Sequence, residues 1–320
     1  MNKCCVGCGE VLQNINESEK GYAKNLDFEY CQRCFRNINY NETKELDLKY
    51  SNDDLLNKIN KKSSLTLFLV DFLSLTKEVT ETFKKIKTEK ILVVNKCDII
   101  PKSVKDEKIM NFICEEYKVL EKIVIVSSLK SKNLSQIKNI IEENKNVYIT
   151  GYTNAGKSSL IKALVNRYCK VKSKITTSIM PNTTLDFIKV KFNETFFYDS
   201  PGFNYLDNIT NNNIKIIKKA NGKKEIKPIT IQIKDNDIIS IDDEWFINVS
   251  KKNSVTFYIN NSFDIKKVYN YEMVNKEYLN VKDDTDLIIK GIGFINFKNA
   301  CTIELSFPLK YIEKRDSIFK

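Results

Sequence analysis

The chain has 320 residues, of which 42% are hydrophobic, and a formal net charge of +11 with no histidine. The length predicts two or three domains, and no stretch approaches the roughly 20 consecutive apolar residues of a membrane-spanning helix. The composition excludes any mechanism that needs an imidazole base. The excess of lysine indicates an anionic partner such as nucleic acid. Because the positive charge is spread along the chain, the alternative is a surface that only makes the protein soluble.

The first 50 residues contain two C-x-x-C pairs, Cys5 with Cys8 and Cys31 with Cys34. This spacing is typical of a zinc ribbon, and four thiolates suit structural Zn²⁺. Redox or disulfide cysteines are the alternative. The N-terminus resembles neither a signal nor a transit peptide, so we expect a cytoplasmic protein in which stable disulfides are rare. Cys4 is a neighbouring thiol that would replace Cys5 in another register.

After a short amphipathic helix at 53–59, the pattern becomes that of an α/β domain. The run LTLFLVDF at 65–72 is typical of a parallel strand buried on both faces. Further strands are predicted at 91–94 and 122–126, with helices at 77–87, 103–117 and 133–141. Alternation of strands and helices predicts a mostly parallel sheet.

The sequence NKCD follows the second of these strands. It predicts a guanine-reading box in which Asp98 accepts hydrogen bonds that only guanine offers, so that ATP would leave this carboxylate unpaired. Asn95 would brace the box against a phosphate loop, and the Lys96 stem would cover the base. After the third strand, SSLK predicts a weaker element, in which Ser127, Ser128 and Leu129 close over the guanine O6.

The sequence GYTNAGKSS at 151–159 fits G-x-x-x-x-G-K-[ST] and lies between a predicted strand at 147–150 and a predicted helix at 159–165. This context predicts a phosphate loop, because glycines, backbone N–H groups and a helix N-terminus meet there. Lys157 would reach the β- and γ-phosphates, and Ser158 would ligate Mg²⁺. The predicted nucleotide-binding residues here are Gly151, Asn154, Ala155, Gly156, Lys157, Ser158 and Ser159.

Two switch elements are predicted after the phosphate loop. The polar stretch at 166–186 contains Thr184, which would bind Mg²⁺ and the γ-phosphate, unless its Ser and Thr are ordinary loop residues. An edge strand at 185–192 and a strand at 195–198 lead into DSPG, where Asp199 would hold Mg²⁺ through water and the Gly202 N–H would sense the γ-phosphate. Base-reading elements thus precede phosphate-binding elements, so the order is circularly permuted.

The last third combines a lysine-rich stretch at 211–227 with six short β-like stretches between 229 and 307. This pattern predicts a small, mostly β interaction domain of the α+β class. Phe257, Tyr258, Phe294 and Phe297 are aromatic candidates for RNA stacking, although core packing is the stronger expectation.

Taken in order, CVGCG, CQRCF, NKCD, SSLK, GYTNAGKSS, PNTT and DSPGF resemble the YqeH family of circularly permuted ribosome-assembly GTPases, over nearly the whole chain. The fold class is therefore expected to be α/β: a permuted P-loop GTPase domain at 51–210, a Cys4 zinc module at 1–50 and a C-terminal domain at 211–320. One departure is Asn182, where the family's switch carries glycine. The resemblance implies that GTP, Mg²⁺ and Zn²⁺ are ligands and that the small ribosomal subunit or its rRNA is the partner. We expect the protein to be a monomer.

Catalysis poses a problem, because the position after D-x-x-G, where related enzymes carry a glutamine, is Phe203. The resemblance implies that Asn154 holds K⁺, whereas a local backbone hydrogen bond is the alternative. We expect slow, K⁺-stimulated GTP hydrolysis with Lys157, Asn154 and Thr184 as catalytic residues. The alternative function is a GTP-gated RNA- or protein-binding scaffold with negligible turnover.

Overall fold

The computed structural model describes residues 3, 5, 10–17, 19, 21–32, 51–169, 187–210, 213–220, 226–269, 271–273 and 276–319. By compactness the chain divides into two units. The first comprises Met1–Asp71, Glu81–Lys96 and Glu121–Tyr205, and the second comprises Phe72–Thr80, Cys97–Leu120 and Leu206–Lys320. The second unit thus takes two short segments from inside the predicted GTPase domain. No helix in these described ranges is long and apolar enough to cross a membrane.

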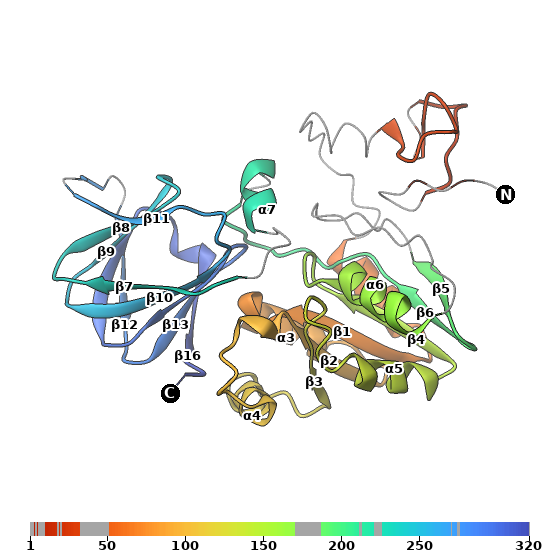
Figure 1. The fold of residues 1–320 in the computed structure, drawn as a ribbon, viewed down its shortest axis with the longest axis horizontal. Helices are drawn as coiled ribbons and strands as arrows, with labels where there is room; N and C mark the ends of the chain where they lie inside the picture. Colours follow the sequence, from red (N-terminus) through yellow and green to blue (C-terminus); the bar gives the residue numbers. More distant parts are fainter. Residues whose placement is uncertain are drawn as a thin grey trace. The chain divides into compact units, whose positions relative to one another are not determined.

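The first unit is built on a six-stranded sheet with the order β3-β2-β1-β4-β6-β5 (Figure 1). Its strands are β1 (Leu65–Asp71), β2 (Lys90–Asn95), β3 (Ile123–Ile125), β4 (Asn146–Gly151), β5 (Ile188–Phe192) and β6 (Thr195–Asp199). All neighbours are parallel except β5, which pairs antiparallel with β6 at the sheet edge. The predicted mostly parallel α/β domain is confirmed.

One face of this sheet is covered by α5 (Leu134–Glu142) and α6 (Lys157–Tyr168). Leu67 and Leu69 of β1 point into this core, where they join Ile137 of α5 and Leu164 of α6. On the other face, Phe68 packs against Phe83 of α3 (Lys77–Lys84), with ring centroids 5.6 Å apart. Both faces of β1 are therefore buried, which explains its uninterrupted apolar run.

Helix α2 (Asn52–Asn60) begins at a capping box, in which Ser51 and Asp54 bond each other's backbone N–H groups. Its Leu55 and Ile59 are buried. At its other end, the Asn60 side chain donates to the Lys85 carbonyl (3.2 Å) and accepts from the Lys87 N–H (2.8 Å). These bonds join the end of α2 to the segment that leads into β2.

The second unit contains two five-stranded antiparallel sheets, ordered β16-β13-β14-β10-β7 and β11-β8-β9-β15-β12. Their strands are β7 (Ile229–Ile233), β8 (Asp237–Ile241), β9 (Trp245–Val249), β10 (Asn253–Ile259), β11 (Ile265–Val268), β12 (Glu277–Val281), β13 (Thr285–Ile289), β14 (Gly293–Phe297), β15 (Cys301–Leu305) and β16 (Ile312–Asp316). The predicted mostly β character of the C-terminal domain is confirmed, and its described residues add only α7 (Ile214–Ala220) and the 3₁₀ helix η3 (Leu309–Tyr311).

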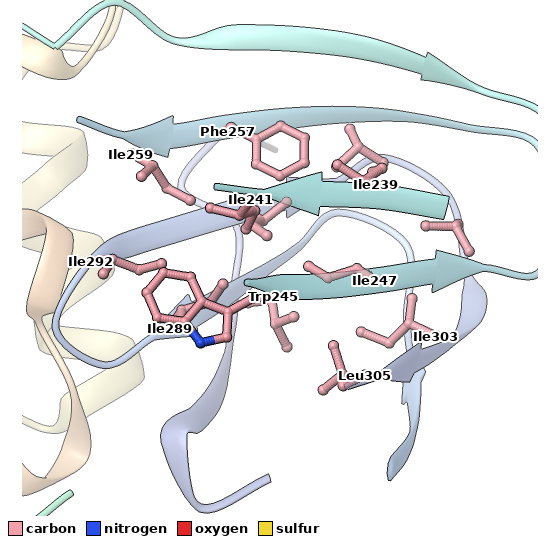
Figure 2. Close-up of a cluster of buried hydrophobic side chains, with 14 of the residues drawn as sticks. Ile239, Ile241, Trp245, Ile247, Phe257, Ile259, Ile289, Ile292, Ile303 and Leu305 are labelled. Carbon is pink, nitrogen blue, oxygen red and sulfur yellow. The ribbon is translucent and has the colours of Figure 1, made fainter. Parts of the chain in front are cut away.

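Both of these sheets contribute to one hydrophobic core, in which Trp245 lies among isoleucines from several strands (Figure 2). The aromatic candidates for RNA stacking belong to the interior of this unit. Phe257, Phe294 and Phe297 are fully buried and Tyr258 is 6% exposed. These rings pack in the domain interior, as the sequence favoured, and are not presented to a ligand.

A buried ion pair also lies in the second unit, next to η1 (Phe72–Ser74) and α4 (Asp106–Tyr117). Arg315 donates through Nε to Asp286 Oδ2 (3.2 Å) and through Nη1 to the Leu75 carbonyl (3.2 Å). The Tyr117 hydroxyl donates to the same carbonyl at 2.7 Å, and burial raises the pKa of Tyr117 to about 12. The Arg315 guanidinium lies 4.9 Å from the centre of the Phe72 ring. This network fixes η1 and α4 to the C-terminal sheets.

Candidate functional site

The predicted nucleotide-binding motifs follow strands whose carboxyl ends meet at one edge of the six-stranded sheet. In the register, Asp71 of β1 lies opposite Asn95 of β2, and Leu69 lies opposite Gly151 of β4. Asp199, the last residue of β6, pairs with Ile149 of β4. In an open α/β sheet this edge is where ligands bind.

The phosphate loop contains glycines with positive φ, as its sequence predicts. Gly151 has φ +140°, and a Cβ added there would lie 2.0 Å from the Leu69 carbonyl oxygen. Gly156 has φ +92°, and Asn154 has φ +64°, a left-handed conformation that asparagine tolerates well. The Ala155 N–H donates to the Tyr152 carbonyl at 3.2 Å, which closes the turn. Helix α6 then begins at Lys157, so Ser158 and Ser159 lie in its first turn.

Lys157 is the buried cation of this loop, with 8% of its surface exposed. Its Nζ donates to the carbonyls of Gly151 and Tyr152, each at 3.1 Å. Burial lowers the pKa of Lys157 to about 8, and the negative charge of Asp199 acts in the opposite direction. A Cβ added at Gly202 would lie 3.0 Å from this ammonium, so the D-x-x-G glycine directly adjoins the phosphate loop.

One amide group, that of Asn95, joins three motifs. Its Nδ2 donates to the Ala155 carbonyl of the phosphate loop at 3.0 Å. Its Oδ1 accepts from both the N–H and the hydroxyl of Ser128, each at 3.0 Å. A Cβ at Gly156 would lie 2.4 Å from Asn95 Nδ2, so this glycine is required by the close approach of the amide. The predicted contact between the guanine box and the phosphate loop is present.

The other residues of the predicted guanine-binding motifs lie in different environments. Lys96 has φ +61° and forms an ion pair with Asp71 Oδ2 at 2.5 Å. The sequence reasoning missed Asp71, although its position as the last residue of a buried strand was a usable signal. Asp98 is half-buried in the 3₁₀ helix η2 (Cys97–Ile99) of the second unit. Ser127 is buried, whereas Leu129 is 54% exposed.

The D-x-x-G segment is bonded to the phosphate loop along its backbone. The Ser200 N–H donates to the Ile149 carbonyl (3.1 Å) and the Phe203 N–H donates to the Gly151 carbonyl (3.1 Å). The Thr153 N–H donates back to the Phe203 carbonyl at 2.8 Å. The parallel pairing of β4 with β6 therefore continues beyond both strands, into the phosphate loop and the D-x-x-G segment.

Phe203 is fully buried in an aromatic cluster. Its ring centroid lies 5.9 Å from that of Phe68 and 5.8 Å from that of Tyr152, and the Tyr152 ring also contacts Tyr205 at 4.6 Å. The Tyr152 hydroxyl lies 2.8 Å from the Thr82 hydroxyl. Sequence reasoning considered Phe203 only as a missing glutamine, whereas the structure makes it the apolar anchor of the D-x-x-G loop.

Some predicted site residues lie outside the described part of the chain. They are the switch residues Thr184 and Asn182 and the zinc-ligand candidates Cys8 and Cys34, together with Cys4. The other two zinc-ligand candidates are described. Cys5 and Cys31 are buried in one small cluster with Leu12 and Ala23, and the Cys31 N–H donates to Cys5 Sγ at 3.1 Å.

The strand order, the phosphate loop and the Asn95 bridge define this protein as a P-loop GTPase with permuted motif order. Residues 146–261 match the family described as "50S ribosome-binding GTPase". The "Uncharacterized protein YqeH" of Bacillus subtilis (strain 168) is 33% identical over 255 residues, which cover 72% of this chain and 68% of that protein. The chain belongs to the YqeH family, and it is a GTPase.

Other relatives share smaller parts of their own length with this chain. The "Small ribosomal subunit biogenesis GTPase RsgA" of Malacoplasma penetrans (strain HF-2) is 34% identical over 37% of this chain and 40% of that protein. The "tRNA modification GTPase MnmE" of Francisella tularensis subsp. novicida (strain U112) is 26% identical over 84% of this chain and 60% of that protein. The crystal structure of YjeQ from Thermotoga maritima is 23% identical over 46% of this chain and 50% of that chain, with a TM-score of 0.33.

Proposed function

We propose that this protein is a GTP-hydrolysing switch that acts in the assembly of the small ribosomal subunit. The observation that carries the nucleotide part is the Asn95 amide, which joins the guanine box, the phosphate loop and the Ser128 loop in one hydrogen-bonded site. Membership of the YqeH family and likeness to a small-subunit biogenesis GTPase support the ribosomal part. The matched family description names the 50S subunit instead, so the experiment must compare both subunits.

In this proposal one group of residues binds the guanine base and another binds the phosphates. Asp98 accepts hydrogen bonds from guanine, the Lys96 stem covers the base and the Ser127–Leu129 loop closes over O6. The fold suits a triphosphate with Mg²⁺, because a buried ammonium, a buried carboxylate and two glycine-lined loops converge at Lys157, Asp199 and Gly202. Ser158, Thr184 and Asp199 would hold Mg²⁺, which would neutralise charge that develops on the phosphates.

GTP hydrolysis is proposed to depend on charge and positioning, without a glutamine after D-x-x-G. The buried Phe203 fixes the D-x-x-G backbone and leaves no side chain there to orient water. Lys157 and Thr184 would stabilise the transferring phosphoryl group, and K⁺ at Asn154 would supply further positive charge. The half-buried, left-handed Asn154 within the loop is compatible with this role.

The experiment is single-turnover GTP hydrolysis in KCl and in NaCl at equal ionic strength, each with purified 30S subunits, with 50S subunits and without subunits. We expect faster turnover in KCl, with a further increase from 30S subunits only. Equal rates in both salts would exclude the K⁺ role. Tight GTP-dependent 30S binding without faster turnover would favour the alternative function, a GTP-gated scaffold. This alternative remains because Phe203 replaces the water-orienting glutamine, so GTP hydrolysis is expected to be slow.

Zinc is proposed as a structural ligand of the N-terminal module. Two of the four proposed sulfur ligands, Cys5 and Cys31, lie together in a buried cluster, and a backbone N–H already donates to one sulfur. Four thiolates favour a closed tetrahedral site that contributes to folding and not to catalysis. Metal analysis of the purified protein should therefore find one Zn²⁺ per chain, and Cys31→Ser should lose it while GDP affinity stays within twofold.

A further inference from the structure

A polar hollow of about 660 Å³ opens at the amino-terminal ends of β1 and β4, at the sheet edge opposite the GTP site. Three lysines line it, Lys62, Lys87 and Lys145, together with a single carboxylate, Glu89. All three lysines are exposed. Within the described ranges no carboxylate lies in ion-pair distance of them. The hollow therefore carries a local excess of positive charge, three ammonium groups against one carboxylate.

Several polar side chains in the wall of this hollow are held by hydrogen bonds. Asn60 bonds the backbone of Lys85 and Lys87, as described above, and the hydroxyls of Thr66 and Thr88 lie 2.9 Å apart. Asn144 Nδ2 donates to the Ile140 carbonyl at 2.7 Å. Because Asn60, Thr88 and Asn144 already bond other groups of the protein, the exposed lysines are the charged groups best placed to recognise an anionic ligand.

An aromatic strip adjoins the hollow on the same face of the sheet. Asn146 lines the hollow, and in the register it pairs with Phe196, whereas Tyr148 pairs with Tyr198. Side chains two residues apart on a strand share a face. Tyr148 stacks on Tyr198 with centroids 4.7 Å apart, and Phe187 meets Tyr148 edge-on at 5.8 Å. Phe187, Phe196 and Tyr198 are half-buried residues, whereas Tyr148 is 8% exposed.

Lysines join the hollow to this strip. Lys62 Nζ lies 5.7 Å from the Tyr148 ring centre and 6.0 Å from that of Phe187. At the far side of the strip, the exposed Lys189 places its Nζ 4.0 Å from the Phe196 ring centre. Lys62 and Lys189 thus flank the aromatic strip, and Lys62 also belongs to the hollow that Lys87 and Lys145 line.

We propose that the hollow and the aromatic strip together form a binding surface for single-stranded RNA. Lys62, Lys87 and Lys145 would contact successive phosphates, and unstacked bases would lie on the rings of the strip. A positively charged groove combined with aromatic rings is the arrangement by which proteins bind single strands without sequence preference, whereas a duplex keeps its bases stacked inside. The proposal rests on the proposed function only for the source of the RNA, an unpaired segment of rRNA.

The test is fluorescence anisotropy of a fluorescein-labelled U12 RNA, titrated with the full-length protein at several KCl concentrations. The variant carries Lys62→Gln, Lys87→Gln and Lys145→Gln. The matched control carries Lys102→Gln, Lys105→Gln and Lys118→Gln, three exposed lysines of the second unit. We expect about 10- to 100-fold weaker binding only in the first variant, and a salt dependence shallower by about 2 in log–log slope, since each lost phosphate contact on a single strand removes about 0.7.

Phe187→Ala tests the aromatic strip separately. It should weaken binding about 5- to 100-fold, the range for loss of one stacked base, while the salt slope stays unchanged. GDP affinity within twofold of the wild type would show that each variant is folded. Binding of U12 within twofold of wild type in the triple lysine variant overturns the proposal, as does tighter binding of labelled polyglutamate than of RNA.

Failure of this proposal and failure of the proposed function give different results. If wild-type protein responds to 30S subunits but the lysine variant binds U12 normally, only the RNA surface is wrong. If U12 binding depends on the three lysines but no ribosomal subunit affects GTP hydrolysis, the surface stands and the ribosomal function is wrong.

Discussion

Lys157 illustrates how the fold changes the chemistry of a single residue. Burial lowers its pKa to about 8, against the opposing effect of Asp199. Nucleotide phosphates would stabilise the charged ammonium, so binding should raise this pKa and take up a proton. Between pH 7 and 9 we therefore expect GDP affinity to fall as pH rises, by up to about tenfold per unit above pH 8, because the free protein increasingly holds the neutral amine.

Isothermal titration calorimetry in two buffers of different ionisation enthalpy would measure that proton directly. Uptake should approach zero at pH 6.5, where Lys157 is charged before and after binding, and should increase towards pH 8.5. Equal uptake at both pH values would exclude Lys157 as the group that titrates.

Asn95 is a second residue whose substitution should strongly reduce both stability and nucleotide affinity. Asn95→Ala would leave the Ala155 carbonyl and the Ser128 N–H without this partner, and each unsatisfied buried group costs about 1–3 kcal/mol. We expect the free energy of unfolding to fall by about 2–4 kcal/mol and GDP affinity to fall at least tenfold. Ser128→Ala is the control in urea denaturation, because it removes only the hydroxyl bond; an equal effect of both variants would contradict the bridging role.

At the scale of elements, the D-x-x-G loop depends on Phe203 for its anchorage. Phe203→Gln restores the residue type that orients water in related enzymes, but places an amide inside a fully buried aromatic cluster. We expect about 3–5 kcal/mol of lost stability and no gain in GTP hydrolysis, measured by urea denaturation and single-turnover kinetics. Phe203→Leu should cost less stability, and a faster Phe203→Gln enzyme would show that this side chain can reach the nucleotide.

The elements of the first unit were largely predictable from the sequence, whereas part of the second unit was not. Strands β1, β2 and β4 are central and apolar on both faces, so they have a clear pattern. The sequence analysis missed β8, β11, β12 and β16. Three of these, β11, β12 and β16, lie at sheet edges, where polar residues protect against aggregation and weaken the apolar alternation.

In the candidate site, too, only part of the structure could be predicted from the sequence. The motifs at 95–98, 151–158 and 199–202 are short and local, so the sequence alone placed them at strand ends. The Lys96–Asp71 ion pair and the Phe203–Phe68–Tyr152 cluster join residues from distant strands. Such contacts depend on strand order, which a single sequence does not specify, and Phe203 was therefore considered only as a substituted glutamine.

At the scale of the whole molecule, the second unit depends on the buried Arg315–Asp286 pair. Arg315→Met would leave the Asp286 carboxylate buried without its cation, which costs about 3–5 kcal/mol. Asp286→Asn combined with Arg315→Met should regain part of this loss, because no uncompensated charge remains. Urea denaturation of both variants checks the expectation, and an Arg315→Met protein within 1 kcal/mol of wild type would contradict it.

The same arginine has a consequence for the order in which the chain folds as it is made. Arg315 bonds the Phe72 carbonyl across 243 residues of sequence. At about 5–20 residues per second, translation needs roughly 12–50 s to supply that partner after Phe72 has left the ribosome. Throughout this interval η1 and α4 lack the arginine and the sheets on which they pack. In its later part, after Asp199 has left the ribosome, the strands of the GTP site up to β6 are already complete. The nascent chain should therefore hold a formed phosphate loop beside unfinished apolar segments, which makes it a natural client for a chaperone.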